Sequence, residues 1–159
     1  MCIRDSNSTG HLGQSIYLRE VEGREDGAPP TVDLEAERTV GDLVRTQIQN
    51  GLITSCHDIS DGGLLVACCE MALASNMGIV FSNFDSSIPV HAKLFGEEQG
   101  RYIVTCNNKD KLLHAAKQAD ITLEVIGITG GSAIKIEGEE IELSELRVIH
   151  ESWLPNYMN

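Results

Sequence analysis

The stretch "CHDISDGGLLVACCEMAL", residues 56–73, changes character halfway along. Its first half holds small and polar residues, and its second half is an apolar run of helical length. We interpret residues 52–58 as a short buried strand and residues 61–78 as a helix that is packed on most of its sides. The polar residues then lie where a strand ends and a helix begins, which is where open α/β sheets bind ligands.

This strand–helix junction combines several features of an anion or metal site. Gly62 and Gly63 lack Cβ atoms, so a ligand can approach the first-turn amides of the helix, which have no helical partner. Asp58 and Asp61 add two carboxylates, and two carboxylates beside a phosphate suggest a shared Mg2+ ion. The candidate ligand-binding residues are therefore Asp58, Ser60, Asp61, Gly62 and Gly63, with Asp58 and Asp61 as the metal ligands.

A structural interpretation of the same junction stays open. Ser60 or Asp61 would cap the helix, the two glycines would allow tight packing of helix and strand, and His57 would form a local hydrogen bond. The stretch is not a P-loop, because no G-K-[ST] follows the glycines.

A second candidate site is the turn in "LFGEEQGRY", residues 94–102. Gly96 and Gly100 bracket Glu97, Glu98 and Gln99, and the turn leads into a strand. Two carboxylates and an amide on one tight turn can hold a metal ion or a polar ligand, and they can equally face solvent. We take Glu97, Glu98 and Gln99 as further candidate ligand-binding residues.

Composition limits the classes of protein that the chain can belong to. Its 159 residues, of which 42% are hydrophobic and 4% aromatic, predict one globular domain with a mainly aliphatic core. A formal charge of −12 argues against nucleic acid and anionic membranes as partners, and no apolar run reaches membrane-spanning length. The five cysteines include no C-x-x-C pair, which predicts reduced thiols in a cytoplasmic protein without a zinc site.

The rest of the chain alternates predicted strands and helices. The pattern predicts an α/β or α+β fold, a mixed sheet with packed helices. For residues 31–51 we expect a helix with Asp33 as its cap and a buried face formed by Leu34, Val40, Leu43, Val44 and Ile48. The other predicted elements are strands at 14–21, 79–82, 101–106 and 121–131, helices at 108–120 and 144–154 (capped by Ser144), and a hairpin at 132–143.

Two parts of the chain differ in organisation. Residues 1–8 show no periodicity, so we expect an unstructured tail or an artificial scar there. Residues 9–159 form the predicted domain, which begins abruptly near Gly10, as though cut from a longer chain.

Three segments, in this order and spacing, carry a family resemblance. They are "GHLGQSIYLREVEGREDGAPPTVDLEAER", "CHDISDGGLLVACCEMAL" and "LFGEEQGRYIV", and over residues 9–155 they resemble the C-terminal end of the phosphoribosylformylglycinamidine synthases of purine biosynthesis. These enzymes belong to the superfamily of aminoimidazole ribonucleotide synthetase. The resemblance implies the fold of that superfamily's C-terminal domain (PurM-C-terminal-domain-like), which is partly ferredoxin-like.

The resemblance also implies an ATP- and Mg2+-dependent ligase reaction. Phosphoryl transfer activates the amide oxygen of formylglycinamide ribonucleotide, and ammonia from a glutaminase subunit or domain displaces it. The catalytic groups belong to preceding ATP-binding domains that this chain lacks, so the chain alone is expected to be inactive and to hold no catalytic residue. It matches the second copy of an internal duplication, whose cleft is expected to be a degenerate or structural nucleotide site.

Two alternatives remain beside this interpretation. The chain could be a non-catalytic docking domain that orders the synthetase active site. It could also be a domain of another ATP-dependent member of the same superfamily.

Overall fold

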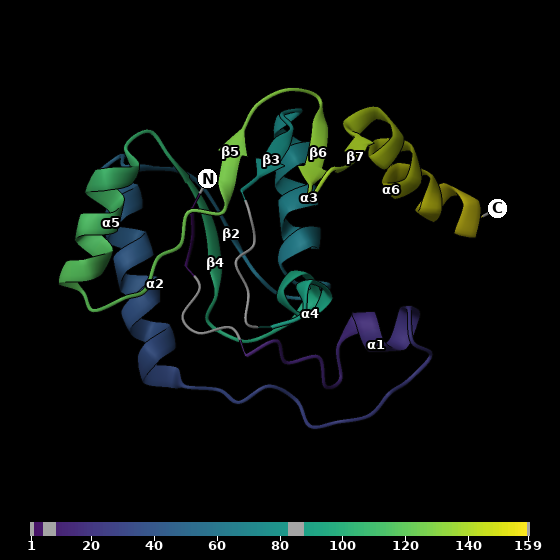
Figure 1. Cartoon of the computed structure of the whole chain (residues 1–159), viewed down its shortest axis with the longest axis horizontal. Coiled ribbons are helices and arrows are strands. Elements are labelled where there is room, and N and C mark those ends of the chain that lie inside the picture. The colour runs from purple at the N-terminus through teal and green to yellow at the C-terminus, as the bar shows by residue number, and fades with distance from the viewer. Residues whose placement is uncertain (1, 5–8, 83–87, 159) are drawn as a thin grey trace.

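The computed structural model describes residues 2–4, 9–82 and 88–158, with the backbone alone for residues 2–4. Two small sheets lie side by side, with helices packed around them (Figure 1). The elements are β1 (Cys2–Arg4), α1 (Ile16–Glu20), α2 (Leu34–Gln49), β2 (Ile53–Asp58), α3 (Gly63–Ser75), β3 (Ile79–Phe81), α4 (Val90–Phe95), β4 (Tyr102–Cys106), α5 (Lys109–Gln118), β5 (Gly127–Thr129), β6 (Ala133–Ile136), β7 (Glu139–Glu142) and α6 (Leu143–Met158).

The first sheet has the strand order β1-β4-β2, and both pairings are antiparallel. β1 and β2 therefore run parallel to each other on either side of β4, which is the split βαβ arrangement of ferredoxin-like folds. The side of this sheet that carries α2 and α5 encloses an aliphatic cluster (Figure 1). Its buried members are Val40, Val44, Ile53, Val104, Leu112, Ala116 and Ile121.

The second sheet has the order β5-β3-β6-β7 and is mixed. β3 is antiparallel to β5 but parallel to β6, and β6 and β7 form the predicted hairpin. The hairpin turns at Glu137 and Gly138, which have φ angles of 49° and 91°, as a two-residue hairpin turn requires. The mixed sheet with packed helices confirms the predicted fold class.

α3 lies at the centre of a second apolar cluster, which also takes side chains from both sheets. Leu64 and Cys68 are fully buried, as expected for a helix that is apolar on most sides. β4 connects the two clusters, because Ile103 packs into the α3 cluster and Val104 into the α2–α5 cluster. Neighbouring strand residues point to opposite faces of a sheet, so one strand serves both cores.

The predicted strand at 14–21 is wrong, because residues Ile16–Glu20 form the short helix α1. The buried Ser15 caps it, and its Oγ accepts a hydrogen bond from the Leu18 N–H at 3.3 Å. The ring of Tyr17 stacks on Phe95, with 5.0 Å between the centroids. A cap and a tertiary ring contact thus outweigh the strand-like alternation of the local sequence.

Other boundaries also differ from prediction. Asp33 caps α2 as expected, but Leu34 and Ile48 at the ends of this helix are exposed. Ser144 lies inside α6 and does not cap it, because the helix begins at Leu143, whose N–H donates to the Ser132 carbonyl at 2.8 Å.

The extent of two strands differs from the prediction. In the 121–131 segment only Gly127–Thr129 form a strand. Cys2–Arg4, in the segment predicted as an unstructured tail, pair with β4.

Candidate functional site

The loop between β2 and α3 places the predicted polar residues at the edge of the first sheet. The Ile59 N–H donates to the Arg101 carbonyl at 2.9 Å, which extends the pairing of β2 with β4 by one residue. The Gly63 N–H donates to the Ser60 carbonyl at 3.0 Å and closes a turn. The strand–loop–helix arrangement of residues 58–63 is therefore the one that the sequence predicted.

The polar side chains of this loop face solvent. Ser60 and Asp61 are exposed residues, and the Asp58 side chain is 66% exposed. His57 Nδ1 lies 2.6 Å from the Asp58 carbonyl oxygen, which is the local contact that the structural interpretation expected, and its Nε2 lies 3.3 Å from a Glu70 carboxylate oxygen. Asp58, Ser60 and Asp61 can thus reach a ligand or a partner without any rearrangement of the core.

Glu97 contacts the start of α3 directly. Its Oε1 accepts hydrogen bonds from the Gly62 N–H at 2.8 Å and from the Ile16 N–H at 2.9 Å. Gly62, with no side-chain cap, is the N-cap of α3, so the expected capping by Ser60 or Asp61 is wrong. The Glu97 carboxylate serves the starts of two helices, where backbone N–H groups favour negative charge.

Glu98 binds the segment that precedes α1. Its Oε1 accepts from the Thr9 N–H at 2.8 Å, the Thr9 hydroxyl at 3.1 Å and the His11 N–H at 3.2 Å. Its Oε2 accepts from Arg101 Nη1 at 2.8 Å. Burial acts to raise the pKa of Glu98, but the charge of Arg101 and the hydrogen bonds from His11 and Thr9 outweigh it and lower this pKa.

Arg101 is a site residue that the sequence analysis missed. Its side chain is 1% exposed and contacts two residues of the turn at residues 96–100. Nη1 donates to the Gly96 carbonyl at 3.3 Å as well as to Glu98. The signal was the spacing of Glu98 and Arg101, three residues apart across a glycine, which suits a turn closed by an ion pair.

The glycine at position 63 is required by packing. A Cβ atom there would lie 2.7 Å from the Cα atom of Phe95 at the end of α4, and the φ angle of Gly63 is 71°. Gly63 therefore has a packing role, but against the end of helix α4 and not, as the structural interpretation had expected, against a strand. Gln99, the third candidate on the neighbouring turn, is an exposed residue.

A magnesium ion would have few protein ligands at this loop. The described residues contain no group of three or more His, Cys, Asp or Glu side chains that could hold a metal ion. Mg2+ commonly takes one or two carboxylates and completes its shell with phosphate oxygens and water. Asp58 and Asp61 are exposed, whereas the carboxylates of Glu97 and Glu98 already accept hydrogen bonds from backbone N–H groups.

A groove of about 760 Å3 lies along the other half of α3. Its lining includes His57 and Cys56 from β2, Glu70 and Met71 from α3, and Cys106 from β4. The four cysteines in the described part of the chain are free thiols, as predicted.

Comparison with known proteins decides the family. The profile of the family described as "AIR synthase related protein, C-terminal domain" matches residues 6–137. The chain belongs to this family. Longer curated proteins resemble this member of the AIR synthase related C-terminal domain family over nearly its whole length.

The "Phosphoribosylformylglycinamidine synthase subunit PurL" of Zymomonas mobilis is 48% identical over 96% of this chain and 21% of its own length. The subunit of the same name from Caulobacter vibrioides is 50% identical over 94% of this chain and 20% of its own length. The chain thus spans about a fifth of the length of these relatives. The identities confirm the resemblance found in the sequence.

Solved structures show the same fold at low identity. The structure titled "T. maritima PurL complexed with FGAR" matches this chain with a TM-score of 0.70 and 18% identity. The match covers 90% of this chain and 27% of the Thermotoga maritima chain. A chain from the HypE–HypF complex has a TM-score of 0.59 and 16% identity over 89% of this chain and 50% of its own. Among the described residues, no helix is both long enough and apolar enough to span a membrane.

Proposed function

We propose that this AIR synthase related domain is the C-terminal part of a phosphoribosylformylglycinamidine synthase. The whole enzyme would be an ATP-dependent ligase that converts formylglycinamide ribonucleotide to the amidine with ammonia derived from glutamine. The observation that carries this proposal is the 48% identity to Zymomonas mobilis PurL over 96% of the chain. Thermotoga maritima PurL has been solved in complexes with FGAR, with ATP and with ADP, which fits these substrates.

In the proposed enzyme, the loop at residues 58–63 faces the ATP-binding domains that precede it. Asp58 and Asp61 would hold Mg2+ together with phosphate oxygens, and the ion would neutralise charge during phosphoryl transfer. Ser60 would contact the nucleotide, and Gly62 and Gly63 would keep the loop narrow. The turn carrying Glu97, Glu98 and Gln99 would complete the nucleotide site beside this loop.

The partners follow from the same proposal. They are the preceding ATP-binding domains and a glutaminase subunit or domain, which fits the solved assembly titled "PurLQS from Thermotoga maritima". The free thiols of the described cysteines fit a cytoplasmic location. We expect no turnover by this chain alone, because one domain cannot hold both ATP and the substrate.

A docking role is a second candidate, and the contacts of Glu97 favour it. Its carboxylate takes the position beside the α3 amides where a phosphate would bind, at 2.8 Å from the Gly62 nitrogen. In this candidate the cleft is structural, and the domain orders a catalytic site located elsewhere in the enzyme.

A chimaera of Zymomonas mobilis PurL that carries this chain in place of its matching stretch tests the proposed function. We expect it to form the amidine from formylglycinamide ribonucleotide, ATP and ammonia, whereas the chain alone forms none. A folded chimaera without activity, or turnover by the pure chain, would contradict the proposal.

Two substitutions in the active chimaera separate the candidates. If Asp58 and Asp61 serve the nucleotide, D58A/D61A lowers the rate at least tenfold without changing the melting temperature. If the cleft is structural, the same variant keeps its rate. The control is Glu25→Ala, an exposed carboxylate in the loop that follows α1, which should change neither quantity.

A further inference from the structure

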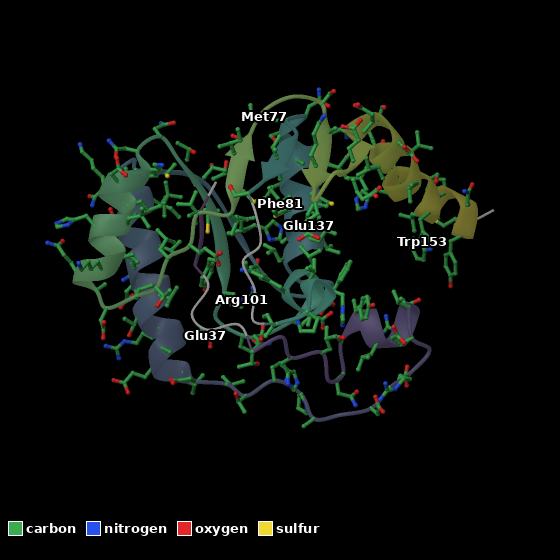
Figure 2. All side chains as sticks on the ribbon, viewed as in Figure 1. Glu37, Met77, Phe81, Arg101, Glu137 and Trp153 are labelled. Carbon is green, nitrogen blue, oxygen red and sulfur yellow. The ribbon has the colours of Figure 1, made fainter. Side chains whose placement is uncertain are left out.

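From Ile149 onward, α6 carries large apolar side chains that the described part of the domain leaves exposed. Ile149 is 60% exposed, Trp153 64% and Tyr157 77%. The rings of Trp153 and Tyr157 stack, with 5.3 Å between their centroids. In Figure 2, Trp153 lies on the part of α6 that extends away from the sheets.

These residues continue the face of α6 that packs into the core. At the base of the helix, Leu146 packs against the cluster around α3. Ile149, Trp153 and Tyr157 follow it by three, seven and eleven residues, so the four side chains form one stripe on a helix with 3.6 residues per turn. We call Leu146, Ile149, Trp153 and Tyr157 the α6 stripe.

The base of α6 is held firmly in place. Leu143 is buried, and Arg147 Nη2 donates to the Leu73 carbonyl in α3 at 2.7 Å. Arg147 Nη1 also pairs with Glu151 at 2.9 Å. The stripe is therefore presented in a defined direction by a helix anchored on the core.

A continuous apolar stripe differs from the scattered apolar residues of an ordinary surface and indicates an interface. The lengths of the curated relatives indicate which surface covers the α6 stripe. The match to Zymomonas mobilis PurL covers 96% of this chain but only 21% of that relative. The other four fifths of such a polypeptide is linked to the stripe, and docking within one molecule loses less translational freedom than docking of a second molecule.

Resting on the proposed function, we propose that the α6 stripe docks against an apolar surface in the preceding four fifths of a PurL-length polypeptide. The stripe is then an interdomain contact and not a surface for self-association. Trp153 is the single tryptophan of the chain, so one label reports on the stripe.

The first experiment labels this chain with 5-fluorotryptophan and follows its 19F resonance. We expect the resonance to shift when the first four fifths of Zymomonas mobilis PurL is added as an unlabelled polypeptide. Ile149→Ser should weaken this binding at least tenfold, whereas Ile128→Ser, at a 67% exposed position of β5, should leave it unchanged. No shift with a folded partner, or a shift that depends on the concentration of this chain alone, would overturn the proposal.

A second experiment covers the case in which the truncated relative does not fold. A photo-crosslinking benzoylphenylalanine replaces Trp153 or Ile128 in the chimaera described above. We expect a crosslink within one polypeptide from position 153 and none from position 128. Crosslinks between two chains, or none from position 153, would contradict the docking.

These readouts are independent of catalysis. A chimaera that crosslinks from position 153 but forms no amidine would support the docking and contradict the proposed function. An active chimaera without this crosslink would support the proposed function and contradict the docking.

Discussion

Glu97 joins two helix starts that are far apart in the sequence. The Ile16 N–H and the Gly62 N–H both donate to its Oε1, and both contacts are part-buried. Loss of an acceptor leaves such donors without compensation, which costs about 1–3 kcal/mol for each buried group. This residue therefore links the N-terminal segment, the loop at 58–63 and the turn at 96–100.

We predict that Glu97→Ala destabilises the domain by about 2 kcal/mol or more. Glu97→Gln should cost less, because its amide oxygen can still accept these bonds. Urea unfolding followed by circular dichroism gives both values. Gln99→Ala, on the exposed side of the same turn, is the control and should stay within about 0.5 kcal/mol of the wild type.

Glu98 makes the stability of the domain depend on pH. Its pKa is lowered on folding: burial acts in the opposite direction, but the Arg101 charge and the N–H donors of His11 and Thr9 prevail. A lowered folded-state pKa stabilises the fold above the unfolded-state pKa of about 4.3, and this contribution is lost as the pH falls through the folded-state value.

We therefore predict that the stability difference between the wild type and Glu98→Gln is largest near neutral pH and shrinks below about pH 4. Urea titrations at several pH values measure it. A difference that stays constant down to the acid-unfolding region would show that the ionised carboxylate of Glu98 is not what stabilises the N-terminal segment.

At the scale of elements, the packing of α3 on the end of α4 depends on one glycine. A Cβ atom at position 63 would lie 2.7 Å from the Cα and carbonyl carbon of Phe95 and 2.9 Å from the Gly96 carbonyl oxygen. These are backbone atoms, so relief would require one element to move relative to the other.

We predict that Gly63→Ala lowers the stability by about 2–4 kcal/mol, the sum of a left-handed φ angle and overpacking. Gly131→Ala is the matched control, because Gly131 has a φ angle of 73° and open space around its Cβ position. The control should cost only about 1 kcal/mol. If both variants lost the same stability, the φ angle alone would explain the effect, and the contact of position 63 with Phe95 would contribute nothing.

At the scale of the whole molecule, two apolar clusters share one strand. Ile103 and Val104 of β4 are each at most 2% exposed and face different clusters. A strand buried on both faces connects the two cores, so we expect the described part of the domain to unfold as one unit.

We predict that Leu64→Ala in the α3 cluster and Leu112→Ala in the α2–α5 cluster each cost about 2–5 kcal/mol. Both variants should shift a single transition that is the same by circular dichroism and by hydrogen exchange in the two sheets. Separate transitions for β2–β4 and for β3–β6 would contradict this coupling.

Local pattern was sufficient for the helices α2, α3 and α5, for the β6–β7 hairpin, and for the location of residues 58–63 between a strand and a helix. Helix caps, glycines at turns and apolar periodicity depend on a few neighbouring residues, so the sequence by itself determines these elements. The alternation of strands and helices predicted the fold class. The family resemblance added the PurM-C-terminal-domain-like fold, because three segments had the right order and spacing.

Only the tertiary structure decided how the two candidate turns are used. The contacts of Glu97 with Ile16 and of Glu98 with Thr9 span 81 and 89 positions of sequence, and no local pattern predicts pairs that far apart. α1 was mistaken for a strand although its cap, Ser15, is local, because Ile16 and Tyr17 contact Glu97 and Phe95, which are far away in the sequence. Glu97 and Glu98 have structural roles because folding brings backbone N–H groups from distant segments to their carboxylates. The topology of the chain decides which N–H groups reach them.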